Sequence, residues 1–91
     1  MTDYIHFPIQ ANSGDVIEVV IDRAANVQLL DPRNFEDYKS RRTYHYIGGY
    51  AKVSPVRLTV PRDDLWHVVV DLGGGAGRVR ASAGLIANAT T

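Results

Sequence analysis

The chain has 91 residues, which suits a single domain over residues 1–91 and leaves no room for a second. It contains no cysteine, so disulfides, thiolate metal ligands and cysteine nucleophiles are excluded. Ten basic residues balance ten acidic ones, and a chain without net charge lacks the long-range field of a general nucleic-acid binder.

The first residues have no basic start followed by an apolar core, so they do not read as a signal peptide. No apolar run approaches the ~20 residues that cross a bilayer. We therefore expect a cytoplasmic protein with no membrane partner.

Period-two alternation of apolar and polar residues predicts three strands in the first third of the chain. They cover residues 5–9, 17–21 and 27–29, and the cluster 12–15 between the first two is typical of a turn. The next segment is different. Asp31-Pro32 starts a turn, and Asn34 is the expected cap of a short helical turn near residues 33–39.

Strand propensity returns over residues 44–47, where we expect the pair Gly48-Gly49 to break or bulge the strand. The run 56–60 lies between Pro55 and Pro61, which predicts a short strand near a sheet edge. Residues 66–72 form the strongest strand pattern, with Trp66, Val68, Val70 and Leu72 on one face.

The glycine-rich segment 73–77 suggests a phosphate loop, but such a loop needs a helix after it. Residues 78–85 alternate as a strand instead, so we predict a hairpin turn. That hairpin would place Asp71 on the same face as Arg78 and Arg80. The last residues, 88–91, are expected to fray.

Seven strand candidates with frequent turns and no long amphipathic helix favour a sandwich or barrel over a βαβ fold. Our prediction is an all-β protein: a small antiparallel β-sandwich of about seven strands, with one short helical turn near residues 33–39. A sandwich of this size has edge strands, so a homo-oligomer is compatible with the sequence.

Catalytic and metal-binding patterns are missing from the sequence. His6, His45 and His67 lack ligand spacing, and we expect them to face solvent, so no metal or cofactor is predicted. No serine lies in a nucleophile elbow, and Asp63 and Asp64 fall in a turn. We therefore expect a protein that is not an enzyme.

The segment 38–50 holds four of the five tyrosines, two arginines and a histidine. Tyrosine and arginine are frequent at binding surfaces, but one tyrosine face can equally be core. On a strand, Tyr44 and Tyr46 would share a face. The candidate binding residues are Asn34, Tyr38, Arg41, Arg42, Tyr44, His45, Tyr46 and Tyr50, joined by His67, Arg78 and Arg80.

Several runs together resemble DUF1883, a family of bacterial domains: GDVIEV, ANVQLLD, YIGGY, SPVRLTVP and WHVVVDLGGGAGRVRAS. They span about residues 4–86. The resemblance implies a small β-rich domain that occurs alone or fused to a TIR domain, and hence a sensing or adaptor role in bacterial signalling or defence. It implies no catalytic residues.

Our first hypothesis is a non-catalytic binding or interaction module whose partner is a protein. The alternative is a sensor of a small anionic or nucleotide-like ligand held by Arg42, Arg78 or Arg80, with nucleic acid an unlikely partner. An uncharacterised enzyme is the third hypothesis, and it requires a cleft with titratable groups in contact.

Overall fold

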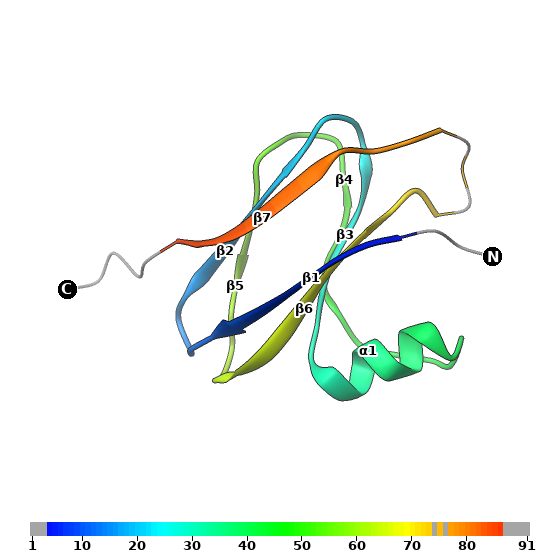
Figure 1. The fold of residues 1–91 in the computed structure, drawn as a ribbon. Coiled ribbons are helices and arrows are strands. Elements are labelled where there is room, and N and C mark those ends of the chain that lie inside the picture. Colours follow the sequence, from blue (N-terminus) through cyan, green and yellow to red (C-terminus); the bar gives the residue numbers. More distant parts are fainter. Residues whose placement is uncertain (1–3, 74, 76, 87–91) are drawn as a thin grey trace.

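The computed structural model describes residues 4–73, 75 and 77–86, which fold into two antiparallel sheets and one short helix (Figure 1). The prediction of an all-β sandwich is confirmed. Within these residues no helix is long and apolar enough to cross a membrane. The elements are β1 (Tyr4–Ala11), β2 (Val16–Ile21), β3 (Ala25–Leu30), α1 (Pro32–Lys39), β4 (Ile47–Ala51), β5 (Val56–Thr59), β6 (Asp64–Asp71) and β7 (Ala81–Ile86).

The larger sheet has four strands in the order β1-β6-β3-β4, and the smaller has three in the order β5-β2-β7. β5 is therefore an edge strand, as the prolines around it predicted. β6 lies in the middle of the larger sheet, paired with β1 on one side and β3 on the other. Its central place explains why it carries the strongest apolar pattern.

The main core lies between the two sheets and is built by the predicted alternation. From β6, Trp66, Val68 and Val70 point inward, while Val27 and Leu29 do so from β3. β2 contributes its own alternating set from the other sheet. Because each inward residue is followed by an outward one, the alternation also determines which side chains occupy the outer faces.

A second, smaller core covers the outer face of the four-stranded sheet, between that sheet and α1. Leu30, Phe35 and Val69 are buried there, and Tyr38 and Tyr44 pack against them. We call these five residues the second core. Helix α1 thus closes part of a sheet face that would otherwise be open to water (Figure 1).

Asp31, and not Asn34, caps the helix. Its carboxylate accepts a hydrogen bond from the backbone N–H of Asn34 at 2.8 Å, and Pro32 occupies the first turn. The helix begins one residue earlier than predicted because the Asp-Pro pair, read as a turn, is itself an N-terminal signal.

The glycine-rich segment is not a hairpin turn. β6 and β7 belong to different sheets, so the chain passes from one layer to the other between Asp71 and Ala81. Asp71 consequently pairs across strands with Tyr4 and Asn26 and does not face Arg78 or Arg80. Positions 74 and 76 and the residues predicted to fray, 88–91, lie outside the described residues.

Residues 44–46 are not a strand, contrary to prediction, and β4 begins only at Ile47. The pair Gly48-Gly49 does not interrupt β4 but lies inside it, opposite Gln28 and Val27. Gly48 has φ +108°, and a Cβ there would lie 2.3 Å from the Val27 carbonyl oxygen. Close approach of two backbones explains this glycine.

Candidate functional site

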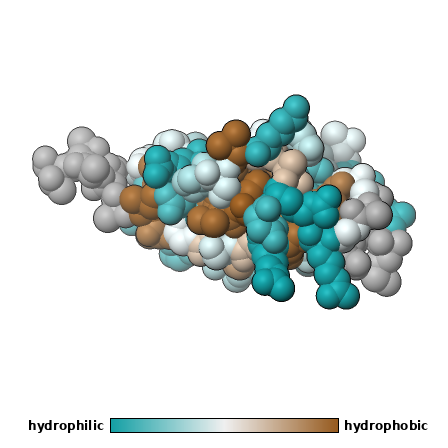
Figure 2. All heavy atoms as spheres, turned by 90° about the horizontal axis from the view of Figure 1, so that it is seen from above, coloured by the Kyte–Doolittle hydropathy of each residue, from teal (hydrophilic) through white to brown (hydrophobic). Residues whose placement is uncertain are grey.

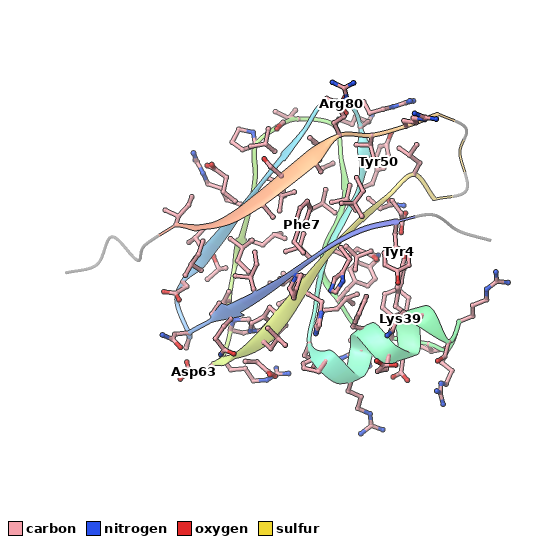
Figure 3. All side chains as sticks on the ribbon, viewed as in Figure 1. Tyr4, Phe7, Lys39, Tyr50, Asp63 and Arg80 are labelled. Atoms are coloured by element: carbon pink, nitrogen blue, oxygen red, sulfur yellow. The ribbon has the colours of Figure 1, made fainter. Side chains whose placement is uncertain are left out.

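The outer face of the four-stranded sheet gathers five of the eleven predicted site residues: Tyr38, Tyr44, Tyr46, Tyr50 and His67. One row across the sheet runs Tyr4, Asp71, Asn26 and Tyr50, as the strand registers show. Helix α1 contributes Tyr38 and Phe35 to this face, and the segment before β4 contributes Tyr44 and Tyr46. Figure 3 shows Tyr4 beside α1 and Tyr50 farther toward the upper end.

A buried carboxylate anchors the row. Asp71 accepts hydrogen bonds from the Tyr38 hydroxyl at 2.7 Å, the Asn26 amide at 2.8 Å and the Gly73 N–H at 2.9 Å. Burial, together with the hydrogen bond and charge of Asp71, raises the pKa of Tyr38 well above its usual range. Tyr38 is therefore a fixed hydrogen-bond donor.

Four tyrosine rings form a continuous ladder. Tyr38 packs edge-on against Tyr4 at 5.4 Å and against Tyr44 at 5.3 Å, and Tyr44 meets Tyr46 at 5.6 Å. The Tyr44 hydroxyl also donates to Gln28 at 3.1 Å. Tyr38 and Tyr44 are half-buried, whereas Tyr46 is 49% and Tyr50 65% exposed. The segment 38–50 therefore packs into the second core through Tyr38 and Tyr44 and is exposed to solvent at Tyr46 and Tyr50.

Two histidines meet on the same face, and sequence reasoning did not pair them. His6 Nε2 and His67 Nδ1 lie 2.7 Å apart, and Phe35 stacks on both rings, at 4.3 Å and 4.4 Å. We call these two residues the histidine pair. The expectation of solvent-facing histidines is wrong for His67, which is 9% exposed.

Both members of the histidine pair favour the neutral form. Burial lowers the pKa of His6, and the Lys39 ammonium lowers it further. Burial also lowers the pKa of His67, helped by His6 and Lys39 and opposed by the weaker pull of Asp64 and Glu36. Neutral imidazoles suit a pair that shares one N–H between two nitrogens.

The segment that joins α1 to β4 is tied back to the helix by Asn34. The Asn34 side chain donates to Asp31 and accepts from the His45 N–H at 2.8 Å. Arg41 adopts φ +59° just after the helix, and Arg42 lies 3.5 Å from Asp37. The side chains of Arg41, Arg42 and His45 remain exposed.

Arg78 and Arg80 do not join this face. The Arg80 N–H donates to Asp22 at 2.8 Å, so both arginines lie beside the end of β2. Figure 3 shows Arg80 at the top of the molecule and Lys39 on α1 below. Arg42, which follows α1, is therefore apart from the two arginines that were expected to act with it.

The structure adds five residues to this face that the candidate set lacked. Alternation along β1, β3 and β6 determines which face each of them occupies, but their convergence depends on strand order, which alternation does not encode. In the described part of the chain, no group of three or more His, Cys, Asp or Glu side chains could hold a metal ion. The added residues are Tyr4, His6, Asn26, Gln28 and Asp71.

The fold and this face define a small β-sandwich whose larger sheet carries an aromatic and histidine cluster under a short helix. Residues 2–89 match the family model described as "Domain of unknown function (DUF1883)", so the chain belongs to that family. Searches of curated proteins and of solved structures each found no match.

Proposed function

We propose that the protein is a non-catalytic module that binds another protein through a tyrosine surface. This surface consists of Tyr46 and Tyr50, together with Arg41, Arg42 and His45 from the segment between α1 and β4. The observation that carries the proposal is the contrast along one aromatic ladder. Its inner tyrosines, Tyr38 and Tyr44, are fixed by hydrogen bonds to Asp71 and Gln28, whereas Tyr46 at its end is 49% exposed. Tyr50, which lies outside the ladder, is 65% exposed.

A surface of this kind binds at low entropic cost. Tyrosine has only two side-chain torsions, and Tyr46 already rests against the fixed ring of Tyr44. Arginine beside tyrosine is typical of the residues that dominate protein interfaces. The exposed rings therefore offer apolar area together with hydroxyls that can reach a polar partner.

Side-chain contacts fit this surface better than addition of a strand. Gly48 and Gly49 have φ of +108° and +147°, so the backbone of β4 departs from regular strand geometry. An irregular edge is a poor template for a pairing strand. The partner would instead contact Tyr46 and Tyr50 from outside the sheet.

A non-catalytic role is supported by how the polar groups of the face are engaged. Asp71 accepts three hydrogen bonds from the protein itself, and the histidine pair is closed on one side by Phe35. Asp71, whose oxygens already accept from three donors of the protein itself, is therefore a poor general base. We place the module in the bacterial cytoplasm, as a sensing or adaptor domain in signalling or defence, which the family resemblance implies.

The test is the triple substitution Arg41→Ala, Arg42→Ala and Tyr46→Ala in the full chain. Proteins captured from cytoplasmic extract would be quantified, and the main one titrated as a purified protein by calorimetry. We expect a loss of affinity of about 100-fold or more, because replacing an interface tyrosine or arginine by alanine often lowers the binding free energy by ~2 kcal/mol. The melting temperature should change little because all three side chains are exposed.

The matched control is Arg33→Ala, Arg57→Ala and Leu65→Ala, three exposed residues away from the tyrosine surface. It should leave affinity unchanged. Equal binding by the two triple variants would refute the tyrosine surface. Unfolding of the first variant would assign its residues to the scaffold instead.

A further inference from the structure

One end of the sandwich gathers basic side chains that are far apart in sequence. The Asp22 N–H donates to the Arg80 carbonyl, and the Arg80 N–H donates to the Asp22 carboxylate. The Arg23 side chain donates to the Arg78 carbonyl at 3.3 Å. The β4–β5 connection reaches the same end, because Ser54 accepts from the Ile21 N–H at 3.0 Å. We call Arg23, Lys52, Arg78 and Arg80 the basic end.

None of these four cations has a carboxylate within salt-bridge distance among the residues that the structure describes. All four are exposed. The one carboxylate beside them, Asp22, accepts from the Arg80 backbone N–H. The basic end therefore keeps a local excess of positive charge.

The opposite end of the sandwich carries charges of both signs. There, Asp15 and Asp63 hold the β1–β2 turn through the N–H groups of Asn12 and Ser13. Asp64 lies next to Asp63 at the start of β6. Figure 3 shows Asp63 at the bottom of the molecule and Arg80 at the top. Arg62 pairs there with Asp31 and Asp64, so its charge is balanced locally, unlike the charges of the four cations at the basic end.

The basic end also has an apolar tip. Val53 is 76% exposed between Lys52 and Ser54, and Val20 nearby is 46% exposed. Figure 2, which views the molecule from above, shows apolar surface bordered by long polar side chains at this end. An apolar tip among cations suits the boundary between lipid headgroups and acyl chains.

We propose that the basic end docks on an anionic lipid surface, with Val53 entering the headgroup boundary and the four cations contacting lipid phosphates. The lack of a signal-peptide pattern and of a long apolar run had led us to expect no membrane partner, and the distribution of charge changes that expectation. A duplex or a free phosphate would use the cations equally well but would give Val53 nothing to bury against.

The experiment is sedimentation of the full chain with vesicles of phosphatidylcholine alone and of equal parts phosphatidylcholine and phosphatidylglycerol. We expect binding to the anionic vesicles only, weakening as salt is added. Arg80→Glu should lower the partition coefficient at least five-fold, since each cation near such a surface contributes about five-fold. Val53→Ser should lower it about ten-fold, the effect of burying one small apolar side chain.

Arg33→Glu, the same charge change on α1, is the matched control and should bind as the unmodified chain does. If Arg80→Glu does not fold, Lys52→Glu tests the same charge reversal and should also lower the partition coefficient. The proposal is overturned by absence of sedimentation at low salt, or by equal losses in Arg33→Glu and Arg80→Glu. Binding to duplex DNA that matches binding to vesicles, with no effect of Val53→Ser, would also overturn it and indicate a polyanion site.

Discussion

At the scale of single residues, the histidine pair is the most informative feature of the outer face. Two imidazoles in hydrogen-bond contact under an aromatic ring cannot both take a proton without losing that contact and bringing two cations together. Lys39, whose ammonium lies 4.7 Å from the centre of the Phe35 ring, opposes protonation too. The packing of α1 is therefore coupled to pH.

We predict that the protein loses stability as the pH falls below the ordinary histidine pKa of 6.5. The folded pKa of each imidazole is lowered, so below 6.5 the unfolded chain takes up protons first and unfolding is favoured. Above that pH both states are neutral and stability is complete. The slope cannot exceed about 1.4 kcal/mol per pH unit for each imidazole. Chemical denaturation from about pH 8 to about pH 5.5 measures it.

His45→Gln, which alters only the exposed histidine, should keep this pH dependence. The double variant His6→Phe and His67→Phe should flatten it. A slope that persists in the double variant would show that other groups carry the effect.

At the scale of elements, β4 depends on one close backbone approach. Gly48→Ala would bring a Cβ to within 2.3 Å of the Val27 carbonyl at a φ that side chains rarely adopt. We expect a loss of at least ~2 kcal/mol, or roughly 10 °C in melting temperature for a domain of this size. Thermal unfolding followed by circular dichroism measures the shift.

Gly84→Ala in β7 is the matched control, because nothing lies within 4 Å of an added Cβ there. It should change the melting temperature little. Equal melting temperatures for the two alanine variants would contradict the close approach between β4 and β3.

The elements also show what alternation encodes and what it does not. Alternation placed β1, β2, β3 and β6 correctly because each side chain's face follows from local backbone geometry. We expected β7 to pair with β6, whereas it pairs with β2, because pairing depends on the order of strands in the whole sheet. It also read residues 44–46 as a strand, whereas the Asn34 side chain holds His45 in a loop. The histidine pair joins positions 61 residues apart, which no local pattern reveals.

At the scale of the whole molecule, the sandwich separates three tasks. The main core between the sheets holds the fold, and the second core under α1 fixes the inner tyrosines. The tyrosine surface and the basic end are the two regions that we propose for contacts with partners, one on the outer face of the larger sheet and one at the end of the strands.

The most direct test of the central claim compares Tyr46→Ala with Tyr38→Phe, measuring partner affinity and free energy of unfolding for both. Tyr46→Ala should weaken binding about ten-fold or more with little change in stability, because its ring is half exposed. Tyr38→Phe should cost roughly 1–2 kcal/mol of stability, since Asp71 loses a buried donor, and should leave affinity nearly intact. The reverse pattern, in which Tyr46→Ala lowers stability and affinity stays unchanged, would contradict the account.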